Sequence, residues 1–110
     1  MTTATAQKPT KNEQRTAKLK AALKELGSGK NKIAETLKAK RVKGDVGDSE
    51  SCPIANYVKR VFPKAASVEV EGGTIDVCWG ADDCISVDTP KAVNDFIGDF
   101  DESHYPDLIK

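Results

Sequence analysis

The chain has 110 residues, of which 38% are hydrophobic and 31% are charged. This length suits one domain, and the low aromatic content predicts a small, mostly aliphatic core. No apolar run approaches the roughly 18 residues that a membrane-spanning helix needs, and the first residues lack the hydrophobic stretch of a secretory signal. We therefore expect a protein without a membrane partner.

The two signs of charge are separated along the chain. Residues 1–44 carry twelve basic and three acidic residues, whereas residues 45–110 carry five basic and fourteen acidic residues. The formal net charge is therefore zero although each half is strongly charged. Such asymmetry is typical of proteins that bind oppositely charged partners. It also suits two halves that attract each other, so both interpretations stay open.

Residues 1–9 show no periodicity and predict a disordered tail, with one domain over residues 10–110. Thr10 and Glu13 have the spacing of a capping box, and an apolar stripe follows at helical spacing until Gly27. These signals predict a first helix over 10–26. A second helix is expected over about 30–41, with Ser28 or Asn31 as its cap.

A third helix is expected after the turn-rich loop 44–51. Ser51 is its predicted cap, Pro53 lies in its first turn, and Pro63 ends it. A closing helix is expected over about 90–101, with Thr89 as its cap. Residues 101–110 either pack on the core or stay mobile.

Between these helices the hydrophobic period changes to two, which indicates strands. Gly72-Gly73 predicts a tight hairpin that places Val68 opposite Val77 and Glu69 opposite Asp76. A third strand is expected to pair Trp79 with Ile85. The whole order predicts an α+β fold of three helices, a three-stranded antiparallel meander and a C-terminal helix. Three helices before a hairpin is also the order of a winged helix.

Three cysteines without a C-x-x-C motif favour free thiols in a reducing, cytoplasmic compartment. In the predicted register Cys78 and Cys84 are diagonal neighbours, too far apart for a disulfide. Cys52 is expected to be a small buried hydrophobe rather than a reactive thiol, although a helix N-terminus can lower a thiol pKa. A zinc site would need all three cysteines and His104 together, a weak signal.

No catalytic constellation is visible. His104 has no orienting partner in sequence, and Gly27-Ser28-Gly29-Lys30 lacks the strand, spacing and hydroxyl of a phosphate loop. We therefore expect no enzyme activity, no metal and no cofactor. The leading hypothesis is a cytoplasmic, non-catalytic module that binds another protein.

Two charged surfaces are candidates for that binding. The acidic candidates lie on the strands, their turns and the last helix: Glu69, Glu71, Asp76, Asp82, Asp83, Asp88, Asp99, Asp101 and Glu102. The basic candidates lie within 11–43: Lys18, Lys20, Lys24, Lys30, Lys32, Lys38, Lys40, Arg41 and Lys43. The alternative hypothesis is that this basic set binds nucleic acid, as a degenerate winged helix or through phosphates alone. No aromatic residue lies among these lysines, which argues against stacking on single strands.

Two short motifs of the sequence are similar to segments of other proteins. Cys52-Pro53-Ile54-Ala55-Asn56-Tyr57 and the segment Phe100 to Leu108 resemble small uncharacterised proteins of actinobacteria and their phages, over roughly residues 33–108. The resemblance implies a cytoplasmic accessory protein, encoded by a bacterium or a phage, and assigns no catalytic residue.

Overall fold

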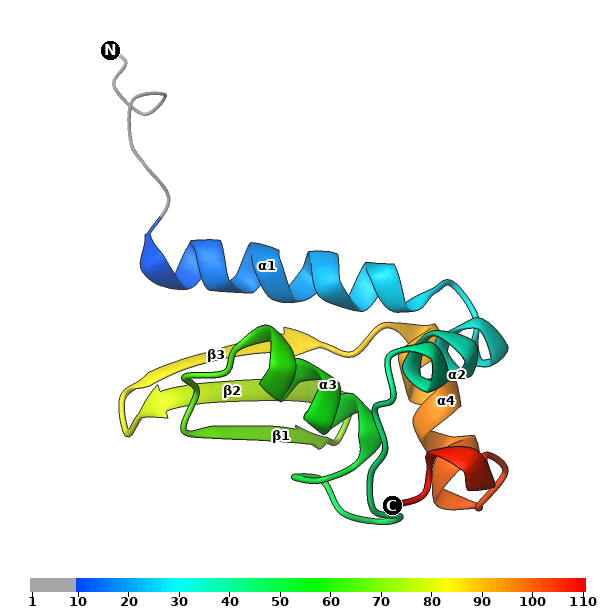
Figure 1. Cartoon of the computed structure of the whole chain (residues 1–110). Coiled ribbons are helices and arrows are strands. Elements are labelled where there is room, and N and C mark those ends of the chain that lie inside the picture. The colour runs from blue at the N-terminus through cyan, green and yellow to red at the C-terminus, as the bar shows by residue number, and fades with distance from the viewer. Residues whose placement is uncertain (1–9) are drawn as a thin grey trace.

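The computed structural model describes residues 10–110, so the predicted disordered tail lies outside the described residues. Three helices, a three-stranded antiparallel sheet and a closing helix confirm the predicted α+β class (Figure 1). The elements are α1 (Lys11–Leu26), α2 (Lys30–Ala39), α3 (Pro53–Val61), β1 (Ser67–Glu71), β2 (Thr74–Gly80), β3 (Asp83–Asp88), α4 (Lys91–Asp101) and the short 3-10 helix η2 (Pro106–Leu108).

The ends of α1 are those that the sequence predicts. The Thr10 hydroxyl accepts a hydrogen bond from the Glu13 backbone N–H at 3.0 Å, and the Glu13 carboxylate accepts one from the Thr10 N–H at 2.8 Å. Gly27 ends the helix with φ at 134°, a conformation that other residues rarely adopt. The apolar stripe is buried as expected, over Leu19, Ala22, Leu23 and Leu26.

The predicted caps of α2 and α3 are wrong. The residue before α2 is Gly29, which has no side chain, so neither Ser28 nor Asn31 caps that helix. The residue before α3 is Cys52, whose Sγ accepts a hydrogen bond from the Ala55 N–H at 3.4 Å. Ser51 lies one residue too early for this role, and its hydroxyl donates to the carboxylate of Asp45 instead.

The cap predicted for α4 is also wrong. The N-cap position belongs to Pro90, which has no side-chain acceptor. Thr89 is held at the end of the sheet because its N–H donates to the carbonyl of Gly73 at 2.8 Å. Within residues 10–110 its buried hydroxyl has no hydrogen-bond partner.

The first hairpin has the predicted register. Val68 lies opposite Val77 and Glu69 opposite Asp76. Gly72 and Gly73 both have positive φ, at 62° and 83°, as the tight turn between twisted strands requires.

The second hairpin is shifted by two residues from its predicted register. Val77 pairs with Ile85, where the prediction pairs Trp79 with Ile85. The pairing is irregular between Cys78 and Gly80, which leaves Trp79 outside the regular ladder. An apolar alternation repeats every two residues, so it cannot distinguish registers that differ by two.

This register places Cys78 directly opposite Cys84, and a disulfide joins them with Cα atoms 4.0 Å apart. The prediction of three free thiols is therefore wrong, because it followed from the shifted register. Cys52 is the one free cysteine between residues 10 and 110.

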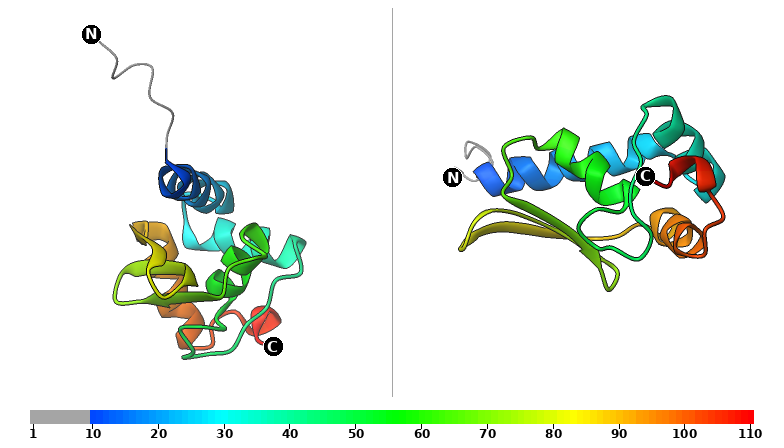
Figure 2. Two further views of the ribbon diagram at one scale, coloured as in Figure 1. Left: turned by 90° about the vertical axis from the view of Figure 1, so that its left-hand side faces the viewer. Right: turned by 60° about the horizontal axis from the view of Figure 1, so that its bottom comes forward.

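The helices cover one face of the sheet and leave the other open. The right panel of Figure 2 shows α1 and α3 on the same side of the three strands, with α4 beyond their end. α3 packs against β1, α1 against β3, and α2 against α4. The covered face of the sheet supplies Val68, Val70, Ile75, Val77, Ile85 and Val87 to the core.

The C-terminal segment packs on the core. Leu108 is buried, and Gly44 donates its N–H to the Leu108 carbonyl while its own carbonyl accepts from Lys110, both at 2.9 Å.

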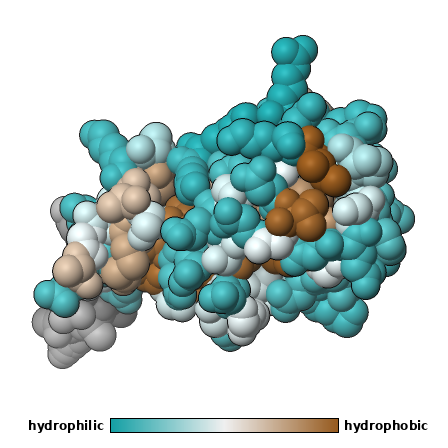
Figure 3. All heavy atoms as spheres, turned by 90° about the horizontal axis from the view of Figure 1, so that it is seen from below, coloured by the Kyte–Doolittle hydropathy of each residue, from teal (hydrophilic) through white to brown (hydrophobic). Residues whose placement is uncertain are grey.

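Seen from below, most of the surface is hydrophilic, with the largest hydrophobic patch toward the half that holds α4 (Figure 3). Over residues 10–110, no helix has the length and apolar character needed to cross a bilayer.

Candidate binding groove between α1 and α3

Arg15 of α1 is held by the end of the second hairpin. Its guanidinium lies 3.6 Å from the centroid of the Trp79 ring, and its Nη1 donates to the Asp83 carboxylate at 3.0 Å. We call Arg15, Trp79 and Asp83 the Arg15 clasp. Since the Arg15 side chain is only 13% exposed, the clasp fixes where the hairpin end lies against α1.

A groove of about 370 Å³ lies beside this clasp, between α1 and the end of α3. The rings of Phe62 and Trp79 meet edge to face, with centroids 5.3 Å apart. Lys18 lies over the Phe62 ring, with its Nζ 5.4 Å from the centroid. We call this the α1–α3 groove; Lys11, Gln14, Arg15 and Lys18 line one side, and Val61, Phe62, Pro63 and Lys64 line the other, with Trp79 between them.

The groove combines apolar area with positive charge. Among residues 10–110, no ion pair engages Lys11, Lys18 or Lys64, whereas Arg15 is paired with Asp83. Tryptophan and arginine are the residue types that most often dominate binding energy at protein interfaces. An acidic ligand with an apolar side chain would meet both kinds of contact here.

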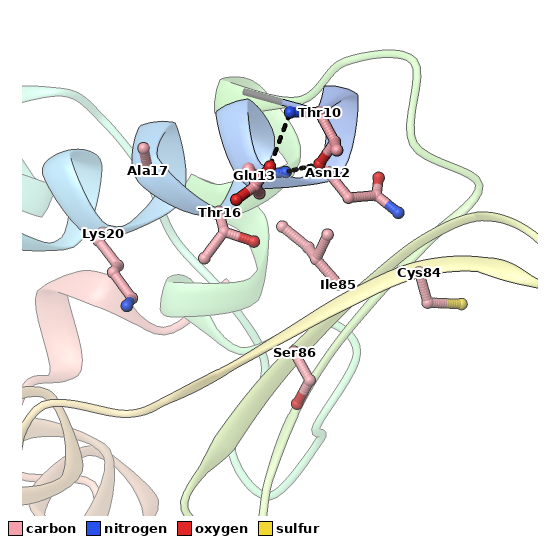
Figure 4. Close-up of a pocket in the computed structure, with 9 residues that line it drawn as sticks. All are labelled: Thr10, Asn12, Glu13, Thr16, Ala17, Lys20, Cys84, Ile85 and Ser86. Atoms are coloured by element: carbon pink, nitrogen blue, oxygen red, sulfur yellow. Dashed lines mark hydrogen bonds between the residues drawn. The ribbon is translucent and has the colours of Figure 1, made fainter. Parts of the chain in front are cut away.

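The opposite side of α1 forms a more open groove against β3, of about 530 Å³ (Figure 4). Its lining is mostly small or polar, and it holds Lys20 but no aromatic residue. In Figure 4 the side chain of Ile85 points toward α1, whereas Cys84 points away from it. Lys24 lies farther along the same side of α1, near Pro90 and Ala92. Of the nine predicted basic residues, only Lys18 therefore lies in the α1–α3 groove.

Two of the predicted basic residues form ion pairs with carboxylates near the C-terminus. Lys30 lies 2.6 Å from Asp99, and Lys38 lies 3.0 Å from Asp107. These pairs join α2 to the C-terminal region, so the two charged parts of the sequence contact each other within one molecule.

The other predicted basic residues are exposed around α2. Lys32 packs its stem close to Gly27, at the start of α2. Beyond the end of the helix, Lys40, Arg41 and Lys43 form an exposed run. Arg60 of α3 donates to the carbonyls of Lys40 and Arg41, at 2.7 and 3.1 Å, and adds a fourth cation to this run.

Four of the predicted acidic residues share the open face of the sheet, where they alternate with buried residues: Glu69, Glu71, Asp76 and Asp88. No Lys or Arg occurs in the three strands. The other five are elsewhere. Asp83 belongs to the Arg15 clasp, Asp82 lies in the neighbouring turn, and the last three lie at the end of α4: Asp99, Asp101 and Glu102.

The end of α4 also holds the one histidine. His104 Nδ1 lies 3.8 Å from Asp99 and its Nε2 lies 3.8 Å from Glu102. The potential ligand atoms of these three residues lie within 4.8 Å of one another. However, Lys30 already binds the Asp99 carboxylate, so the arrangement is that of an ion-paired surface cluster.

The hydrogen bond from Lys30 lowers the pKa of Asp99, and the same bond raises the pKa of Lys30. The contribution of this pair to stability is present above the unfolded Asp pKa of about 3.9, and it is lost as the pH falls through the lower folded value. Asp99→Asn is therefore expected to destabilise the protein at pH 7 and to have less effect near pH 3. Urea unfolding of both proteins at the two pH values measures this.

Cys52 is a structural residue, as the sequence predicts. The residue is 4% exposed, and burial raises the pKa of its thiol despite the helix N-terminus beside it. A thiol with a raised pKa is a poor nucleophile at neutral pH.

Most of the groove was not predicted from the sequence. Lys11, Arg15 and Lys18 follow one another at i, i+4 and i+7, a pattern that places them on one side of a helix and that was visible in the sequence. Phe62 and Trp79 carry no such signal, because they reach α1 only through tertiary packing. No aromatic residue lies among the predicted lysines along the chain, but in space Lys18 lies over the ring of Phe62.

No family model, curated protein or solved structure matches this chain.

Proposed function

We propose that the protein is a non-catalytic interaction module that binds an acidic segment of another protein in the α1–α3 groove. The observation that carries this proposal is the set of three cations around the Phe62–Trp79 surface that have no ion pair within residues 10–110: Lys11, Lys18 and Lys64. The acidic open face of the sheet repels the same ligand, so it favours binding on the helical side.

The groove favours a particular kind of acidic segment. Carboxylates of the ligand would pair with the three lysines at the rim, where they contribute mainly to association rate and orientation. An aromatic or aliphatic side chain of the ligand would pack beside Trp79 and Phe62, where burial supplies most of the affinity. We therefore expect alternating acidic and apolar residues in the partner.

A fluorescein-labelled peptide in which Asp and Glu alternate with Leu is the probe for this proposal. Its fluorescence anisotropy should rise with added protein at about 50 mM salt and less steeply at about 200 mM salt. The double variant Lys18→Glu, Lys64→Glu should weaken binding by about tenfold or more, since it places like charges opposite the ligand.

The matched control is Lys20→Glu, Lys24→Glu. It makes the same charge change on exposed lysines, with both on the opposite side of α1. Its affinity for the peptide should stay within about twofold of the original, because salt screens charges across that distance. Equal losses in the two double variants would show that only net charge matters and would refute the groove as the site.

Nucleic acid is the second candidate ligand, and the contact of Arg60 with Lys40 and Arg41 favours it. That cluster with Lys43 could neutralise phosphates without reading sequence. Entry of α3 into a major groove is less favoured, because α3 packs against both β1 and α1 and exposes mainly Lys59 and Arg60. Anisotropy of a labelled random duplex, with Lys40→Glu, Arg41→Glu, Lys43→Glu as the variant, tests this candidate.

We also propose that this module is an accessory protein of an actinobacterium or its phage. The two motifs behind that resemblance have structural roles. Asn56 donates to the carbonyls of Lys43 and Ser51, and Tyr105 stacks 5.0 Å from Phe96. Action in the cytoplasm stays a prediction, and the disulfide removes the support that free thiols would have lent to it. Detection of the chain in the soluble fraction of such cells, with its cysteines trapped in their native state, tests both points.

A further inference from the structure

The disulfide brackets the residues that hold Arg15. Cys78 immediately precedes Trp79, and Cys84 immediately follows Asp83, so the bond closes the short loop that carries the two clasp residues in contact with Arg15. The strand pairing is irregular at this place, so backbone pairing alone holds the loop weakly. We propose that the Cys78–Cys84 pair is a redox control on the α1–α3 groove: the disulfide form holds the Arg15 clasp and the groove, and the dithiol form releases them. The effect on ligand affinity rests on the proposed function.

The disulfide is accessible to a reductant. It lies on the open face of the sheet, where Cys84 is exposed and Cys78 is half-buried. The remaining thiol, Cys52, is buried at the start of α3 and cannot exchange with it without unfolding. The reaction therefore needs an external dithiol and involves only one pair of protein sulfurs.

The exchange balances with a dithiol as the reductant. A thiolate of the dithiol attacks Sγ of Cys84, the Cys78–Cys84 bond breaks, and Cys78 leaves as a thiolate that takes up a proton. The second thiol of the reductant then attacks the mixed disulfide and releases Cys84. The protein gains two thiols, and the dithiol gives up two electrons and two protons as it becomes a disulfide.

Loss of the bond leaves the loop held only by irregular backbone pairing and by side-chain contacts. The ion pair of Arg15 with Asp83 is partly exposed, with Asp83 47% exposed, so on its own it holds the loop weakly. Trp79 would move away from Phe62 and from the guanidinium, and the floor of the groove would lose its shape.

The single tryptophan of the chain reports this change directly. Reduction with dithiothreitol should move the emission maximum of Trp79 to longer wavelength and increase its quenching by acrylamide. It should also weaken binding of the acidic peptide by at least about fivefold. The variant Cys78→Ser, Cys84→Ser should match the reduced protein with or without the reductant, whereas Cys52→Ser should respond as the original does.

Thiol counting under native conditions identifies each state. The oxidised protein should show no rapidly reactive thiol, and the reduced protein two, with Cys52 still protected. Three reactive thiols would mean that reduction opens the whole fold, and none would mean that the disulfide resists the reductant; either result overturns the proposal. So would two thiols with unchanged Trp79 emission and quenching.

The outcomes for redox control and for peptide binding are separable. If Trp79 responds to reduction but neither form binds the peptide, the proposed function fails and the redox coupling is retained. If both forms bind the peptide equally well, the groove is retained and the redox control is wrong.

Discussion

Replacing Phe96 with alanine is expected to lower the free energy of unfolding by about 3 to 5 kcal/mol. Phe96 is completely buried on α4, which packs against α2. Its ring stacks on Phe100, with centroids 5.9 Å apart, and on Tyr105, at 5.0 Å. The substitution would leave a cavity that α4 and the C-terminal segment share, and surrounding side chains can fill such a cavity only in part.

Urea unfolding followed by far-ultraviolet circular dichroism measures this loss. Phe96→Leu keeps most of the volume and should cost less than about 1.5 kcal/mol. A loss from Phe96→Ala below about 1 kcal/mol, within the range of surface changes, would contradict the packing between α4 and residues 105–108.

The second large effect is expected at Gly44, where alanine should destabilise the fold by about 3 kcal/mol or more. A Cβ built on Gly44 would lie 2.4 Å from the carbonyl carbon of Cys52 and 2.4 Å from the nitrogen of Pro53. Both are backbone atoms at the start of α3, so they cannot turn aside as a side chain would. Hydrogen bonds to the Leu108 carbonyl and from the Lys110 N–H hold Gly44 on its other side.

Gly98 is the matched control. It lies inside α4, and a Cβ there would meet no atom within 4 Å. Gly98→Ala should therefore stabilise the protein by about 0.5 to 1 kcal/mol, because alanine is the better helix former. The pair of glycine variants should change the urea midpoint in opposite directions. Equal changes would show that Gly44 is not enclosed as described.

Local signals in the sequence were sufficient for the helices and the first hairpin. The capping box at Thr10, the glycine stop at Gly27 and the two glycines at 72 and 73 act through neighbours within a few residues. Such contacts do not depend on the rest of the fold, which is why the order of elements follows from the sequence. Caps were less predictable, because the Ser51 hydroxyl donates to Asp45, and the backbone N–H of Thr89 donates to Gly73 and holds that residue at the sheet.

The register of the second hairpin and its disulfide needed the tertiary structure. Two registers that differ by two residues bury the same apolar face, and the choice between them depends on how tightly the turn at Asp82 closes. One choice separates Cys78 from Cys84, and the other joins them. The two registers differ little in the apolar area that they bury, yet only one of them allows the two cysteines to form a disulfide.

The sequence by itself determined the α+β class, the four helices, the register of the first hairpin and the division of charge between the two parts of the chain. Only the tertiary structure decided where that charge can act. It pairs Lys30 with Asp99, and it brings Phe62 and Trp79 beside Lys18. The physical reason is that periodicity and caps are local, whereas a groove consists of side chains that are distant in sequence and meet only when the core forms.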